Sequence, residues 1–309
     1  MWFDKLTSLV SSLSLPKGRI EVEGSSMSKN GLVLEGGGMR GLYTCGILDT
    51  FMEKGIDFDG AVGISAGACF GCNLKSRQPG RALRYNRRFA GDKRFCSFRS
   101  WIMTGDIYNA EFCYKTIPQE LDPFDFETLK ANPMEFYMGV TDMETGKALF
   151  PKFIDGNDKE LAWMLASASM PLAARIVEID GGKYMDGGIA DSIPLAFMQS
   201  QGYDRNVVIL TQPRNYVKKP NSLMPLIRLV YRKYPKFIEA TAHRHEMYNE
   251  ETRYVFEQEK AGNVLVFCPE ESLNISRIER NVNELQRVYD IGRRIAESRL
   301  DEIREFLGR

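Results

Sequence analysis

The sequence predicts an α/β fold in which a mostly parallel sheet is flanked by helices. Two observations support this fold class. Short apolar segments with the composition of strands alternate along the chain with segments of helical periodicity. Two of the expected strands also end in glycine-containing turns that lead directly into an expected helix. This alternation is typical of parallel strands that are joined by helices packed on the sheet.

The size and composition of the chain are those of a globular protein. Its 309 residues are 43% hydrophobic, which suffices for one large domain or for a domain with an extension. The 41 basic and 41 acidic residues balance, so the overall charge gives no indication of a nucleic-acid partner. Six cysteines in so long a chain do not form a disulfide framework, which favours a reducing compartment. We therefore expect a cytoplasmic protein.

The N-terminal part, residues 1–28, is expected to hold a short amphipathic helix and a linker. Apolar side chains recur at helical spacing over residues 1–15, among them Trp2 and Phe3, before Pro16 interrupts the pattern. This helix either docks on the core or lies in a membrane interface, which would place the protein at the inner face of the membrane. Neither a signal peptide nor a membrane span is expected, because no apolar segment is long enough.

Residues 29–215 contain the alternating elements and are expected to form one domain. Strands are expected at the segments GLVLE, GAVGI, FYMGVTD, ARIVEI, NVVILTQ and NVLVFC, with helices over residues 40–54 and 66–75. Residues 216–309 are expected to be mostly helical and to pack on that domain. Within them, residues 222–261 have helical composition, and residues 276–307 carry the regularly spaced apolar side chains of an amphipathic helix. Nothing in the sequence indicates an oligomeric state.

The segment GGGMRG follows the first expected strand and precedes the first expected helix. Gly36, Gly38 and Gly41 fit the G-x-G-x-x-G pattern of dinucleotide-binding loops, and Asp57 or Asp59 lies about twenty residues further on. This match is weak when taken alone. A nucleotide-binding loop would also leave the turn at the end of the next strand without a role, so the two turns have to be interpreted together.

The next expected strand ends in GISAG, where Gly63, Ser65 and Gly67 form a G-x-S-x-G pattern. At a strand-to-helix junction this pattern predicts a sharp turn that exposes a nucleophilic serine above the sheet. Neighbouring parallel strands lie about 5 Å apart, so the glycine turn at residues 36–41 is expected beside Ser65. The glycine amides would then form an oxyanion hole for an ester attacked by Ser65, with Arg40 adding positive potential.

A histidine base for this serine could come only from His243 or His245. The order of serine, acid and histidine along the chain fits the triad of an α/β-hydrolase, so this alternative stays open. Both histidines, however, fall within a charged segment of helical composition, where surface side chains are the more common outcome.

A carboxylate is the other candidate base. Asp186 follows the ARIVEID segment and is itself followed by Gly187 and Gly188. Two glycines after an acidic residue allow a tight turn, in which the backbone can approach a neighbouring element closely. Asp186 could thus be held against the hydroxyl of Ser65, although D-G-G alone most often marks only a turn.

Taken together and in this order, GGGMRG, GISAG and DGG resemble the patatin-like phospholipase family. The resemblance covers roughly residues 31–213 and includes the segment from Ser167 and Pro171 to the aspartate. The remainder is similar to bacterial members that carry an extra C-terminal helical region. The resemblance implies a three-layer patatin-like fold with a catalytic domain over residues 29–215. It also implies a lipid acyl hydrolase that needs neither metal nor cofactor and whose partner is a lipid acyl ester.

Carried over to this chain, the resemblance makes Ser65 the nucleophile and Asp186 the proton acceptor. The oxyanion turn would consist of Gly36, Gly37, Gly38, Met39, Arg40 and Gly41, with its donors among the amides around Gly37, Gly38 and Met39. Two places depart from the family pattern: Glu35 stands where plant patatins have Asp, and the run Asp191, Ser192, Ile193, Pro194 stands where many members have Asn before the proline region. The second departure could change how the Asp186 loop is braced. A catalytically silent regulatory module on the same fold is the alternative outside enzymology.

The segment from Lys75 to Arg99 carries a net charge of about plus eight. It is either a solvated helix face or a contact for anionic lipid headgroups, for which Arg81, Arg84, Arg87 and Arg88 are the candidates. A nucleic-acid contact is less well supported, because no recognised motif surrounds it. Residues 100–132 are rich in aromatics and prolines and could form a lid or an acyl-chain wall. The C-x-x-C at Cys69 and Cys72 is expected to pack within a helix rather than to bind metal.

Overall fold

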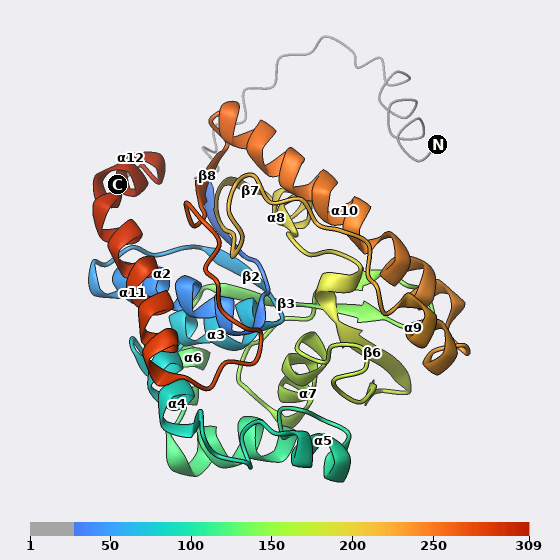
Figure 1. Ribbon diagram of the computed structural model, residues 1–309. Helices are drawn as coiled ribbons and strands as arrows, with labels where there is room; N and C mark the ends of the chain where they lie inside the picture. Colours follow the sequence, from blue (N-terminus) through green and yellow to red (C-terminus); the bar gives the residue numbers. More distant parts are fainter. Residues whose placement is uncertain (1–27, 309) are drawn as a thin grey trace, which may run out of the picture.

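A twisted sheet lies at the centre of the computed structural model, which describes residues 28–308 (Figure 1). Its strands follow the order β5-β6-β3-β2-β1-β7-β8, with β4 paired to β3. The bounds are β1 Lys29–Leu34, β2 Gly60–Ile64, β3 Glu135–Asp142, β4 Ala148–Leu149, β5 Val177–Ile179, β6 Gly182–Asp186, β7 Tyr203–Ile209 and β8 Val264–Phe267. The five strands from β3 to β8 in this order are parallel, and β4, β5 and β6 are antiparallel to their neighbours.

Both faces of the parallel part are buried, because side chains alternate between them along each strand. Leu32 and Leu34 of β1 belong to one apolar cluster, whereas Val33 belongs to another. The same alternation separates Val207 of β7 from Val208. The short apolar runs recognised in the sequence are therefore the centre of a three-layer structure.

Helices α2 (Gly41–Glu53), α3 (Ala66–Lys75), α4 (Arg81–Phe89), α6 (Phe126–Ala131) and α11 (Val282–Ser298) lie together on one side (Figure 1). Helices α2 and α11 touch through their backbones. A Cβ placed on Gly46 would lie 2.1 Å from the Tyr289 carbonyl oxygen, and one on Gly292 would lie 2.0 Å from that of Tyr43. Only glycine permits so close an approach, so α11 packs directly against α2, the helix that follows the glycine turn.

The opposite side of the sheet is covered by α8 (Leu195–Ser200) and the long α10 (Pro235–Lys260), whose Tyr248 and Val255 join the second apolar cluster. Helix α9 (Met224–Val230) precedes α10. The remaining helical elements are α5 (Phe98–Thr104), α7 (Asp158–Ser167), α12 (Leu300–Phe306), the π-helix η2 (Phe112–Leu121) and the short 3-10 turns η1 (Gly38–Arg40) and η3 (Gly187–Ile189). None of the helices within residues 28–308 combines the length and apolarity needed to cross a bilayer.

The α/β class with a mostly parallel sheet is confirmed, and each expected strand segment contains a strand. Two expectations were wrong in detail. The segment ARIVEI forms only a three-residue strand, because left-handed Asp180 and Gly181 reverse the chain into β6, which ends at Asp186. The helix expected over residues 276–307 begins at Val282, where the Asn281 side chain caps it, and breaks before Leu300. The amphipathic helix expected over residues 1–15 lies outside the described residues.

Candidate active site

The two turns expected to meet are in direct contact. Strands β1 and β2 pair in parallel register, so the chain leaves both at the same edge of the sheet. A Cβ on Gly36 would lie 2.9 Å from the Cβ of Ser65 and 2.8 Å from the carbonyl oxygen of Ile64. The first turn therefore lies against the second with no room for a side chain between them.

Ser65 occupies a strained turn between β2 and α3. Its φ of 53° is in the left-handed region, which a residue with a side chain adopts only at a cost of about 1–3 kcal/mol. The surroundings fix this conformation. The Ser65 amide donates a 3.0 Å hydrogen bond to the Ser167 hydroxyl, and Gly63 and Gly67 pass so close to backbone atoms that a Cβ on either would overlap them. The sequence thus folds here into the sharp elbow expected of a nucleophile.

Asp186 ends β6 and reaches Ser65 from two strands away. Its amide donates to the Ser169 carbonyl at 2.9 Å, its carbonyl accepts from the Thr141 hydroxyl at 2.8 Å, and its carboxylate accepts from the Gly188 amide at 2.9 Å. Burial raises the pKa of this carboxyl above its ordinary value. The nearby Arg244 and a hydrogen bond with the Ser65 side chain work against that rise. The outcome is a buried carboxylate that is more basic than an exposed one.

The glycine turn offers two unused donors. The amides of Gly37 and Gly38 make no hydrogen bond to another loop or side chain within residues 28–308, whereas the Met39 amide donates to the Arg277 carbonyl at 3.3 Å. Gly38 has a φ of 58°, and a Cβ there would lie 2.7 Å from the same carbonyl oxygen. Of the three amides expected to stabilise an oxyanion, those of Gly37 and Gly38 are therefore free to do so.

Glu35 anchors this turn to the far side of the sheet. Its buried carboxylate accepts hydrogen bonds from the amide and hydroxyl of Thr211 and from the Tyr248 hydroxyl, the last at 2.9 Å. The loop after Asp186 is braced in a similar way by Glu251 of α10, which accepts from the amides of Ser192 and Ile193. Helix α10 thus supports both the glycine turn and the loop after Asp186.

Asp191 and Glu251 are neighbouring buried carboxyls, and Asp191 stands at one of the departures seen in the sequence. The Oδ1 of Asp191 has no hydrogen-bond partner within residues 28–308. Burial raises the pKa of both groups, that of Asp191 to about 6. A raised folded-state pKa stabilises the fold below the ordinary pKa near 4, and this contribution is lost as the pH rises through about 6. We expect Asp191→Asn to unfold a few degrees higher than the wild type at pH 8 but not at pH 4.5.

Thermal unfolding followed by circular dichroism at both pH values checks this expectation. Asp301→Asn, at a fully exposed position, serves as the control for removing one surface carboxylate. An unfolding temperature of Asp191→Asn that is shifted equally at both pH values would show that Asp191 and Glu251 do not hold a proton between them.

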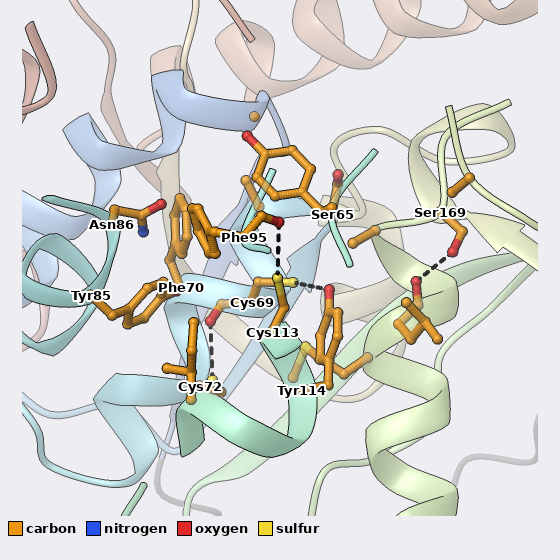
Figure 2. A pocket seen from close by; sticks show the side chains of 18 of the residues that line it. Ser65, Cys69, Phe70, Cys72, Tyr85, Asn86, Phe95, Cys113, Tyr114 and Ser169 are labelled. Atoms are coloured by element: carbon orange, nitrogen blue, oxygen red, sulfur yellow. Dashed lines mark hydrogen bonds between the residues drawn. The ribbon is translucent and has the colours of Figure 1, made fainter. Parts of the chain in front are cut away.

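An apolar cavity of about 190 Å³ opens from Ser65 away from the sheet (Figure 2). Figure 2 shows its wall, which includes Cys69, Phe70, Tyr85, Phe95, Cys113 and Tyr114. Residues 106–126 supply part of that wall. A role of residues 100–132 as a lid or an acyl-chain wall stays a prediction. Cys69 contacts the Tyr114 hydroxyl at 3.3 Å, and all six cysteines are free thiols.

The two histidines lie apart from Ser65. His243 is exposed on α10 and pairs with Glu246, while His245 contacts the Ala242 carbonyl of its own helix. Neither lines the cavities that contain Ser65. The residue between them, Arg244, does line one of them and donates to the carbonyl of Gly188. No short-range signal distinguishes Arg244 in the sequence, because its position depends on how α10 crosses the sheet.

The basic segment has two kinds of environment. Arg81 is only 4% exposed and donates to the Asp122 carbonyl and to the Asn73 side chain, so it is turned inward. Arg84, Arg87 and Arg88 are exposed on α4, although Arg84 also pairs with Asp122. A contact with anionic lipid stays a prediction for these three exposed arginines.

Comparison with known proteins places the chain in a family. The chain is 31% identical over 235 residues to the uncharacterized protein YjjU of Escherichia coli, a match that covers 67% of this chain and 64% of that protein. It is also 31% identical over 183 residues to Lysophospholipase nte1 of Emericella nidulans, which covers 56% of this chain and 11% of that protein. This chain therefore matches less than two thirds of the length of either relative.

Among solved structures, VipD from Legionella pneumophila aligns with a TM-score of 0.45 and 13% identity over 96% of this chain and 73% of that one. A family model described as Domain of unknown function (DUF6363) matches residues 234–308. The model described as Patatin-like phospholipase matches residues 32–198, which contain the glycine turn, the serine elbow and the D-G-G turn. The chain belongs to the patatin-like phospholipase family.

Proposed function

We propose that this protein is a serine hydrolase of lipid acyl esters that works through a Ser65–Asp186 dyad. The observation that carries the proposal is the convergence on one cavity of a strained serine, a buried carboxylate close to its side chain and two free glycine amides. Residues 29–215 hold these reacting groups, and the C-terminal residues 216–309 support them from α10 and α11.

The reaction has two balanced steps. Asp186 accepts the proton of the Ser65 hydroxyl while the Ser65 oxygen bonds to the ester carbonyl carbon. The tetrahedral intermediate then expels the alcohol, which takes the proton, and leaves an acyl-enzyme. Water attacks the acyl carbonyl and transfers a proton to Asp186, and the fatty acid leaves as Ser65 regains its hydrogen. In both steps the amides of Gly37 and Gly38 stabilise the negative oxygen.

The surroundings of Asp186 support its use as a base without a histidine. A carboxylate of ordinary pKa near 4 is a weak base at neutral pH. Burial raises the pKa of Asp186, and its contact with the Ser65 hydroxyl aligns the proton for transfer. The preorganised amides then supply the remaining stabilisation where charge develops.

The shape of the cavity supports a lipid as the substrate. Ser65 lines a mostly apolar cavity whose wall consists largely of aromatic, aliphatic and thiol side chains, an environment that accepts an acyl chain. The name of the nte1 relative, a lysophospholipase, agrees with this substrate class. Hydrolysis of a fatty-acyl ester to an acid and an alcohol is the reaction that this arrangement supports best.

The base is tested by comparing Asp186→Asn with the double variant His243→Ala/His245→Ala in hydrolysis of a p-nitrophenyl ester. We expect Asp186→Asn to lower turnover at least about a hundredfold, in the range typical of general-base removal, and the double variant to stay within about twofold of the wild type. Activity lost only in the double variant would support a Ser-His-Asp triad. A wild type that cleaves no acyl ester would support a catalytically silent regulatory module on the same fold.

A further inference from the structure

We propose that a second, cationic cavity beside Ser65 binds the phosphate group of an anionic glycerophospholipid during hydrolysis. This inference rests on the proposed function, since it names the substrate class of the same site. The four cations that would hold the phosphate are Arg40, Lys218, Arg244 and Arg277. Three of these four come from the part of the chain that follows residue 215.

Ser65 stands between two cavities of opposite character. The apolar cavity and the cationic cavity share Ser65, Gly38, Met170 and Arg277 in their walls. The cationic one is much smaller, at about 40 Å³, and also contains Asp186 and Gly188. An ester at Ser65 would therefore direct its acyl chain into the first cavity and its glycerol with the attached headgroup toward the second.

The cations of the small cavity are not held in ion pairs, although Glu35 lies near Arg40, and Asp186 near Arg244 and Arg277. Within residues 28–308, none of the four forms an ion pair. The Nε of Arg40 is buried without a hydrogen-bond partner, and Arg244 is engaged only by the neutral carbonyl of Gly188. Lys218 lies over the ring of Tyr248, 4.1 Å from its centre.

The two carboxylates of this cavity are already in use. Glu35 is occupied by Thr211 and Tyr248, and Asp186 by Ser65 and the Gly188 amide. Burial and the nearby Arg244, Arg277 and Arg40 lower the pKa of Lys218 to about 7, with Glu35 opposing them. Positive charges held this close together favour binding of an anion. A bound anion would raise the pKa of Lys218 again and so restore its charged form.

The geometry of the substrate favours an esterified phosphate as that anion. In a glycerophospholipid the acyl ester and the phosphate are attached to the same three-carbon unit. One substrate molecule can therefore present its ester to Ser65 and its phosphate to the cationic cavity at the same time. Arginine forks bind phosphate through paired charge-assisted hydrogen bonds. A neutral glycerol ester would leave the cations unpartnered, and a choline headgroup would bring a further positive charge to them.

The experiment compares two lipids with the same chain, 1-lauroyl-glycerol-3-phosphate and 1-lauroylglycerol, in mixed micelles of one neutral detergent. We expect wild-type kcat/KM to favour the phosphate about tenfold or more, the size expected for a charge-assisted hydrogen bond. Arg277→Gln should bring the ratio close to one, and Arg277→Lys should recover at least half of the preference. Arg253→Gln, an exposed change on α10, is the control for net charge.

Binding to Ser65→Ala, measured by titration calorimetry, separates the subsite from the reaction. Tighter binding of the phosphate lipid by Ser65→Ala supports the subsite even where no ester is cleaved, which would overturn only the proposed function. Cleavage of both lipids with equal kcat/KM and no effect of Arg277→Gln would overturn the subsite. Inorganic phosphate that binds while the two lipids bind equally would show a site for the free ion and also overturn the proposal.

Discussion

Ser65→Ala is expected to lower the rate of ester hydrolysis by at least about a thousandfold and to abolish labelling by a fluorophosphonate probe. The change removes the only atom that forms the acyl-enzyme, and loss of a nucleophile from a cooperating set removes nearly all of its contribution. Residual activity would come from the two glycine amides, which would still polarise a bound ester. Initial rates with a p-nitrophenyl ester and gel detection of the labelled protein check this result.

The fold should tolerate this substitution, because alanine meets the same left-handed strain as serine at the Ser65 position and loses only the bond to Asp186. Ser200→Ala, at an exposed end of α8, is the control for removal of a hydroxyl. Unchanged turnover and unchanged labelling in a folded Ser65→Ala variant would refute the serine mechanism.

Gly38→Val is expected to lower turnover by about a hundredfold to a thousandfold, the usual effect of losing an oxyanion donor. The left-handed φ at Gly38 disfavours any Cβ, and the added atoms would meet the carbonyl of Arg277. Relief of that overlap requires the turn to move, and the amides of Gly37 and Gly38 would move with it. The effect should appear mainly in kcat, because these amides act on the charge of the transition state.

Gly55→Val is the matched control for this prediction. Gly55 has a similar φ of 66°, but a Cβ there would meet nothing within 4 Å. The two variants therefore share the backbone strain and differ in the overlap and in their distance from Ser65. Equal losses of turnover after correction for the folded fraction would mean that strain alone, and not displacement of the donors, explains the effect.

The local parts of this site could be predicted from sequence. The strand, the glycine turn and the G-x-S-x-G elbow are encoded within residues 31–67, and adjacent parallel strands bring such turns together. The position of Asp186 was predicted less well, because the short hairpin that carries it depends on Asp180 and Gly181 adopting left-handed conformations. A strand pair of that length has a weak hydrophobic pattern.

The supporting residues could not be predicted, because each reaches the site through a long-range contact. Arg244 and Glu251 follow Ser65 by well over a hundred residues in sequence, and their positions follow from the packing of α10 on the sheet. In that segment the sequence pointed to His243 and His245 rather than to Arg244, because histidine is a common catalytic base. Arg277 belongs to a segment expected to be helical, whereas a loop places it against the glycine turn.

The contact between the Met39 amide and the Arg277 carbonyl has a consequence for biosynthesis. The glycine turn is translated early, but its partner carbonyl is added more than two hundred residues later, and the glycine contact between α2 and α11 comes later still. A ribosome-bound chain can therefore carry Ser65 and Asp186 without the finished turn. The timing of translation would then keep the proposed lipid hydrolase inactive until residues 216–308 have emerged and docked.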